Sequence, residues 1–364
     1  MKKILALLLA MAMVFGMVAC GSSEEAVASE VASEAAASTA ASEVASEAAA
    51  STAASVAEEV AANPDRNGDG TVTIAYSAIA YSIAVLPQYL YSNLEATCAE
   101  RGWEFVPLAA EGDAMLQGEQ VNQLVQQDPD YFVLFPADPA LAVDWVQVVG
   151  DAGIPCITLH TDVAAAEDGT PNANVAAYCG PDNVAMAADI AKALIEKHGA
   201  DAGLKIVEIG GVPVQSDYIQ RVAGFDEYIK ANSNYEILGI EWAYSNRADA
   251  QGYMESFIGT YGDEIDVLMG FDDDLTLGGV NALQEAGMTD VEVYSITGQK
   301  EAMTAVQDGM MTLTAFYSTA AAVADVFAVI DQIAAGETPE YYHYTATPHV
   351  TADNVAEYAS QAEF

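Results

Sequence analysis

Polar side chains that can hydrogen-bond a small molecule follow several apolar runs of this sequence. They are His160, Thr161, Asp162, Asp138, Asp272 and Thr297. Hydroxyl, carboxylate and imidazole groups suit the hydroxyls of an uncharged solute, since a buried polar group left without a partner costs about 1–3 kcal/mol. The sequence therefore predicts a hydrogen-bonding rim around a small polar ligand.

Aromatic side chains near the same apolar runs can cover the flat apolar faces of such a ligand. Tyr81, Tyr244 and Tyr317 are the candidates for this role, and each adds a hydroxyl that can hydrogen-bond. The remaining candidates from these segments are Ser82, Tyr218 and Arg247.

A purely structural role is the alternative for several candidates. Asp138 precedes Pro139 at a predicted helix start and can cap that helix, as can one or two of the residues 272–274. His160 can be a packing histidine. Arg221 lies inside a predicted helix, where pairing with an acidic neighbour is the expected role.

Catalytic and metal-binding signatures are absent from the sequence. It contains no GxSxG, Walker A or HExxH motif, and the four histidines follow no metal-ligand spacing. We expect a binding protein with no cofactor and no metal. The enzymatic alternative is an extracellular glycosidase that uses Asp138 and Asp272 as paired carboxylates.

The segment 65–70 imitates the first half of an EF-hand loop, with Asp65, Asn67 and Asp69 in order. Position twelve of such a loop needs a bidentate glutamate, and here it is Tyr76. We expect a polar turn, with calcium binding as the alternative.

Charge narrows the class of partner. The chain has 11 Lys and Arg against 54 Asp and Glu, a formal net charge of -43. Such a surface repels nucleic acid and anionic ligands. A neutral sugar, polyol or nucleoside fits best, and the negative charge also allows an amine.

The first residues resemble an export signal. Lys2 and Lys3 precede an apolar run, and Met-Val-Ala-Cys-Gly at 17–21 resembles the lipobox in which the cysteine is acylated. Cys20 is therefore the expected lipid anchor, which places the protein on the outer face of the cytoplasmic membrane, as in Gram-positive bacteria. Residues 21–70 are expected to form a tether, rich in Ala, Ser and Glu over most of its length. The other cysteines, Cys98, Cys156 and Cys179, are expected to be buried thiols.

From residue 71 onward, short β-rich runs alternate with helical ones, which is typical of parallel sheets. We predict strands at 71–76, 131–135, 155–159, 204–209, 235–241, 267–269 and 291–296. We predict helices at 89–101, 113–127, 139–152, 183–198, 218–231, 248–261, 275–286, 300–308 and 319–335. One small sheet cannot contain this many strand–helix alternations, so we expect two doubly wound α/β lobes. In such sheets the ligand is held beyond the carboxyl ends of the strands.

Five segments together resemble the type I substrate-binding proteins of ABC importers, in particular the ribose-binding-like sugar group. They are GIPCITLHTD, YCGPDNVAMAADIAKAL, YIQRVAGFDEYI, FDDDLTLGGVNALQEAG and YSITGQKEAMTAVQDGMMTLTAFYS. The resemblance implies two Rossmann-like lobes joined by a three-segment hinge: 71–181 with 318–342, and 182–317 with 343–364. It also implies ligand contacts at His160, Thr161, Asp272, Thr297 and Tyr317, with Tyr81, Ser82 and Tyr244 as further contacts.

The same resemblance implies a receptor that closes on its ligand and delivers it to a membrane ABC permease, and a monomer is expected. Ribose-type members have an Asp-Arg pair where this chain has His160-Thr161, and an Asp where it has Thr297. The ligand is therefore expected to differ from ribose. A receptor that feeds a sensor instead of a permease is the alternative.

Overall fold

The computed structural model describes residues 63–81, 85–163, 170–244 and 246–363. These residues form two six-stranded sheets. The first sheet has the order β11-β5-β4-β3-β1-β2, and all its pairings are parallel. Its strands are β1 (Thr73–Ala78), β2 (Glu104–Ala109), β3 (Tyr131–Phe135), β4 (Cys156–Leu159), β5 (Ala177–Gly180) and β11 (Tyr342–Tyr344).

The second sheet repeats this order later in the chain, as β12-β10-β9-β8-β6-β7. Its edge strand β12 pairs antiparallel with β10, and the other pairings are parallel. Its strands are β6 (Lys205–Gly210), β7 (Glu236–Trp242), β8 (Val267–Gly270), β9 (Glu292–Thr297), β10 (Leu313–Phe316) and β12 (His349–Val350).

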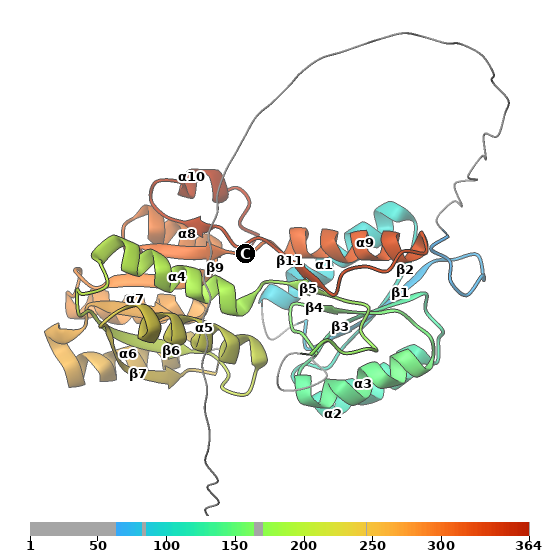
Figure 1. The fold of residues 1–364 in the computed structure, drawn as a ribbon, viewed down its shortest axis with the longest axis horizontal. Helices are drawn as coiled ribbons and strands as arrows, with labels where there is room; N and C mark the ends of the chain where they lie inside the picture. Colours follow the sequence, from blue (N-terminus) through green and yellow to red (C-terminus); the bar gives the residue numbers. More distant parts are fainter. Residues whose placement is uncertain (1–62, 82–84, 164–169, 245, 364) are drawn as a thin grey trace, which may run out of the picture. The chain divides into compact units, whose positions relative to one another are not determined.

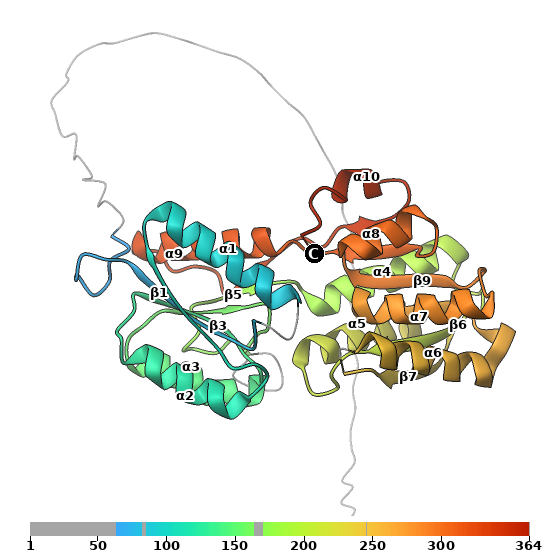
Figure 2. The same cartoon turned by 180° about the vertical axis from the view of Figure 1, so that it is seen from behind.

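Helices cover both faces of each sheet (Figures 1 and 2). On the first sheet, α1 (Val85–Arg101) and α9 (Thr319–Ala334) pack on one face, and α2 (Ala114–Val125) and α3 (Pro139–Asp151) on the other. We call this sheet with its helices the first lobe. Because its inner strands are buried on both faces, they read as continuous apolar runs such as Tyr131–Phe135.

The second lobe is built in the same way. On one face of its sheet lie α4 (Asn183–His198) and α5 (Ser216–Asn232). The other face carries α6 (Arg247–Tyr261), α7 (Asp273–Ala286), α8 (Lys300–Gln307) and the short α10 (Val355–Tyr358). The prediction of two parallel-sheet α/β lobes is therefore confirmed.

The chain passes between the lobes three times. It leaves β5 for α4, returns from β10 to α9, and leaves β11 for β12. Residues 343 and 344, which the sequence assigned to the second lobe, pair with β5 in the first sheet.

A carboxylate from the end of the chain joins the two lobes. Glu363 follows the second-lobe helix α10, and its side chain accepts hydrogen bonds from the Thr319 hydroxyl and from the backbone N–H of Ala320, at the start of the first-lobe helix α9 (3.0 Å for Ala320). The Nζ of Lys300, at the start of α8, donates to the Glu363 carbonyl at 3.1 Å. Glu363 thus contacts both lobes beside the second crossing.

The EF-hand-like segment is a polar turn whose side chains bind backbone. Asp65 accepts from the N–H groups of Gly68 and Gly70, and Asn67 accepts from Asp69. Tyr76, at the position of the missing glutamate, is fully buried in the core. Among the described residues, no three His, Cys, Asp or Glu side chains come together in a way that could hold a metal ion.

The three internal cysteines are buried free thiols, as predicted. The predicted export signal, Cys20 and most of the tether lie outside the described residues. Within the described part of the chain, every helix is too short or too polar to cross a lipid bilayer.

Candidate functional site

The carboxyl end of β4 brings His160 into a buried position between two aromatic rings. Its ring centroid lies 5.2 Å from that of Phe135 and 5.3 Å from that of Tyr317. The backbone of His160 is left-handed, with φ of 68°. A non-glycine residue adopts this conformation at a cost of about 1–3 kcal/mol, which is typical of functional sites.

Two charged residues of α5 face this histidine. The Nε2 atom of His160 lies 3.9 Å from Oδ2 of Asp217, and the same oxygen lies 3.9 Å from Nη2 of Arg221. Both separations exceed hydrogen-bond length. The side chains of His160 and Arg221 are 5% exposed and that of Asp217 is 12% exposed, so water reaches all three only slightly.

Arg221 is held in place from two sides. Its Nε donates to Oδ1 of Asn183 at 2.8 Å, and its Nη1 donates to the carbonyl of Phe271 at 3.0 Å. Its guanidinium also lies 5.4 Å from the ring centroid of Tyr218. The sequence predicted an acidic partner for Arg221, and Asp217 is that neighbour. The guanidinium nevertheless keeps N–H groups for a further acceptor.

Tyr218 is almost fully buried, against Gly211. A Cβ on Gly211 would lie 2.1 Å from a ring carbon of Tyr218, so a glycine is required there. The ring of Tyr218 thus adds a cation–π contact to the two hydrogen bonds that hold Arg221.

Two buried polar atoms beside this cluster have no hydrogen-bond partner among the described residues. They are Nδ1 of His160 and the hydroxyl of Tyr317. A buried polar group without a partner costs about 1–3 kcal/mol. The rings that carry these atoms have centroids 5.3 Å apart, and Nε2 of the same histidine lies 3.9 Å from Asp217. The two atoms therefore form an incomplete hydrogen-bonding set that a polar ligand can complete.

The strand ends of the second lobe supply the next polar groups. The hydroxyl of Thr297 donates to Oδ2 of Asp272 at 3.5 Å, and the backbone N–H of Tyr317 donates to the carbonyl of Thr297 at 3.0 Å. Thr297 also has a positive φ, 129°. Asp272 caps α7 by accepting from the N–H of Asp274, so it has the capping role that the sequence allowed.

Asp273 links the segments around these strand ends through hydrogen bonds. Its carboxylate is fully buried and accepts from the N–H of Gln299 at 2.7 Å and from the hydroxyl of Thr314 at 2.8 Å. The loop after β9 and strand β10 are thereby linked to the start of α7.

Burial decides the charge state of three groups here. It lowers the pKa of His160 to about 4, and the nearby Asp217 only partly opposes this, so the imidazole is neutral at pH 7. Burial raises the pKa of Asp272 to about 6 and that of Asp273 to about 7. A neutral imidazole both donates and accepts, which suits a hydroxyl group.

A cavity of about 930 Å³ adjoins this cluster. Asn183, which anchors Arg221, lines it, as do Asp138 and Asp162. Asp138 caps α3, as the sequence allowed, and Asp162 accepts from the Tyr341 hydroxyl at 2.9 Å. An aromatic wall formed by Tyr178, Tyr342 and Tyr344 completes the cavity. Its volume is sufficient for a sugar-sized ligand.

Some predicted residues lie away from this cluster. Tyr81 packs within the first lobe, with its ring centroid 4.7 Å from that of Tyr91. Arg247 is paired with Asp274 and Glu301, and both Glu301 oxygens are 2.8 Å from its guanidinium nitrogens. Tyr244 is 65% exposed. Thr161 is buried beside His160, and Ser82 lies outside the described residues.

Sequence reasoning did not select Asp217, Asn183 or the tyrosine wall. Asp217 and Asn183 lie in the first turns of helices, whereas the expected ligand contacts follow strands. The signal for Asp217 was its position four residues before Arg221, since residues i and i+4 share one face of a helix.

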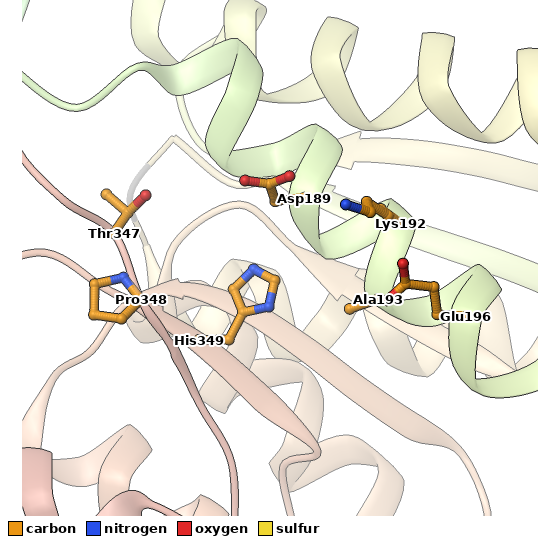
Figure 3. Close-up of a pocket in the computed structure, with 7 residues that line it drawn as sticks. All are labelled: Asp189, Lys192, Ala193, Glu196, Thr347, Pro348 and His349. Carbon is orange, nitrogen blue, oxygen red and sulfur yellow. The ribbon is translucent and has the colours of Figure 1, made fainter. Parts of the chain in front are cut away.

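A smaller cavity of about 370 Å³ lies on the second lobe, between α4 and the segment 347–349 (Figure 3). Its charged lining groups are Asp189, Lys192, Glu196 and His349. Burial lowers the pKa of His349 and the carboxylate of Asp189 opposes this. None of the residues predicted for the ligand site lines this cavity, so it is a separate feature.

The chain matches the periplasmic binding protein domain over residues 74–338 and belongs to this family, a family of substrate-binding proteins. The predicted family resemblance is thereby confirmed. The xylitol-binding protein of Mycolicibacterium smegmatis is 28% identical over 69% of this chain and 70% of its own length. The ribose import binding protein of Bacillus subtilis is 26% identical over 62% of this chain and 70% of its own length.

Solved structures of ABC transporter solute-binding proteins have the same fold. The protein of Mycobacterium smegmatis with bound glycerol is 25% identical, with a TM-score of 0.71 over 81% of this chain and 99% of its own. The protein of Bacillus halodurans with bound myo-inositol has a TM-score of 0.72 and is 24% identical, covering 81% of this chain and 99% of its own.

Proposed function

We propose that this protein captures an uncharged polyol or sugar between its lobes and delivers it unaltered to an ABC importer in the membrane. The observation that carries the proposal is the pair of buried atoms without partners, Nδ1 of His160 and the hydroxyl of Tyr317, beside Asp217 and Arg221. Related proteins named for xylitol and ribose support the same ligand class.

An uncharged ligand follows from the charges around the cluster. Asp217 and Asp272 lie near the guanidinium of Arg221, and His160 is neutral at pH 7. An anionic ligand would be repelled by these carboxylates and by the net charge of -43. Hydroxyl groups can both donate to the carboxylates and accept from the guanidinium.

We assign His160, Thr161, Asp272, Thr297 and Tyr317 to ligand binding, with Asp138 and Asp162 on the cavity wall. No chemical step is required of them. The paired-carboxylate alternative is weakened because Asp138 and Asp272 each cap a helix. Incubation with glycosides should therefore yield no product.

To identify the ligand, the melting temperature is measured with pentoses, hexoses, linear polyols, inositols and nucleosides, each at 1 mM. A ligand present at a concentration 100 times its Kd stabilises the folded state by about 2.7 kcal/mol. This raises the melting temperature by several degrees. We expect such a shift for at least one polyol or sugar. Shifts only with acids or amines, or turnover of a glycoside, would contradict the proposal.

Lipid attachment at Cys20 is part of the proposal, with 1–20 as the signal peptide and 21–70 as the tether. The lobes are then 71–181 with 318–344, and 182–317 with 349–363, and the protein acts as a monomer. Cys20→Ser should move the protein from the membrane fraction into the medium, because one thiol carries the whole anchor. Cys98→Ser is the control and should stay with the membrane. Retention of the Cys20 variant would contradict acylation.

A further inference from the structure

We infer that Asp217 is a specificity-determining residue, which makes the site accept hydroxyl groups and reject carboxylates at the position facing Arg221. The inference rests on the proposed function and narrows its substrate class to ligands with adjacent hydroxyls at this point.

Among the described residues, the carboxylate of Asp217 has two long ion-pair contacts and no hydrogen bond of ordinary length. Its Oδ2 atom is 3.9 Å both from Nε2 of His160 and from Nη2 of Arg221, too long for a hydrogen bond in either direction. Yet only 12% of the side chain is exposed. A carboxylate that is largely withdrawn from water and stands beside two groups without touching them can accept hydrogen bonds from a bound solute.

Three polar atoms near Asp217 are also available for hydrogen bonds to a ligand. Nδ1 of His160 and the hydroxyl of Tyr317 have no partner among the described residues, although both residues are more than nine-tenths buried. The two hydrogen bonds from Arg221 to Asn183 and Phe271 use Nε and Nη1. Nη2 therefore remains as a donor beside Asp217.

Two adjacent hydroxyls match this arrangement. One can donate to Oδ2 of Asp217 while its neighbour accepts from Nη2 of Arg221, so the pair bridges the 3.9 Å gap. A ligand carboxylate would also attract Arg221, but it would stand close to Asp217 at low exposure, where like charges repel strongly. Asp272, also near Arg221, adds to the repulsion.

The test is Asp217→Asn, which keeps the shape and removes the charge. The matched control is Glu227→Gln, which removes one carboxylate from an exposed position of the same helix. Binding by calorimetry is compared for neutral and acidic probes with the same carbon skeleton: xylitol and xylonate, D-glucose and D-glucuronate, D-galactose and D-galacturonate. Thermal unfolding of each variant reports its folding.

We consider the neutral probe that the wild-type protein binds. Compared with wild type, Asp217→Asn should bind this probe at least tenfold more weakly, and should bind the acid with the same carbon skeleton at least tenfold more tightly. A packing defect would weaken both. The control should match wild type. The inference is overturned if the ratio of the affinities for the neutral and the acidic probe is the same in Asp217→Asn as in wild type. It is also overturned if a folded Asp217→Asn variant loses affinity for both probes equally.

The measurements with the acidic probes distinguish failure of the proposed function from failure of the role of Asp217. If the wild-type protein binds none of the neutral probes, and none of the wider polyol and sugar panel, the proposed function fails. The role of Asp217 is then still decided by whether Asp217→Asn gains affinity for the acids. If the neutral probes bind and discrimination does not change, only the role of Asp217 fails.

Discussion

Asp273, buried beneath the candidate site, should make the protein lose stability as the pH rises. Burial raises its pKa from 3.8 to about 7, and the accepted hydrogen bonds from Gln299 and Thr314 only partly oppose this. The folded state therefore holds a proton that the unfolded state releases between pH 4 and 7. In this window the free energy of unfolding falls as the pH rises.

The size of the effect follows from the shift. A rise of about three pKa units corresponds to roughly 4 kcal/mol, at about 1.36 kcal/mol per unit. Asp273→Asn imitates the protonated acid, since its amide oxygen can accept from Gln299 and its amide nitrogen can donate to the Thr314 hydroxyl. The variant should match wild type near pH 4 and exceed it by up to about 4 kcal/mol above pH 7.

Urea titrations of the ligand-free protein at pH 4.5 and pH 8 measure this difference. The carboxylate of Asp272 adds to the raised pKa of Asp273, so the measured difference includes the repulsion between these two carboxylates. Asp308→Asn, at an exposed position after α8, is the control and should behave as wild type at both pH values. The reasoning is refuted if Asp273→Asn is no more stable than wild type at pH 8, or if its advantage is the same at both pH values.

Two further predictions concern ligand binding and helix packing. Because burial raises the pKa of Asp272 to about 6, ligand affinity measured by calorimetry should fall about tenfold from pH 7 to pH 5, as the carboxylate takes up a proton. Asp272→Asn should bind at least tenfold more weakly at pH 7 and lose most of this pH dependence; a variant as tight as wild type would place the ligand elsewhere. Gly224→Ala should destabilise the second lobe by about 1–3 kcal/mol, because its Cβ would lie 2.3 Å from the carbonyl oxygen of Val184 on α4. The control Gly252→Ala, in α6 with no atom within 4 Å, should be neutral or stabilising, and equal melting temperatures for the two variants would contradict this packing argument.

Much of the fold could be predicted because apolar periodicity reports burial directly. The sequence predicted strands at the positions of β1, β3, β4, β6, β7, β8 and β9, and helices at α1 to α9. It did not predict β2, whose run EFVPLA contains a charge and a proline. It also did not predict β5, β10, β11 and β12, which have two to four residues each and take their conformation from the neighbouring strands.

The candidate site could be predicted where it depends on strand ends. His160, Thr297 and Tyr317 each follow or end a strand, and the structure brings them to one cluster. Side-chain direction could not be predicted, because it depends on packing between elements. Tyr81 turns into its own lobe and Arg247 toward two carboxylates, whereas Asp217 reaches the cluster from a helix.

The two short strands near the end of the chain have a consequence for biosynthesis. β11 is the edge strand of the first sheet and β12 that of the second, and only the segment 345–348 separates them. A nascent chain that stops before residue 342 therefore exposes an unpaired edge on both sheets, a known template for aggregation. The same short segment, 342–350, completes both sheets, so both lobes should finish folding at nearly the same stage of translation.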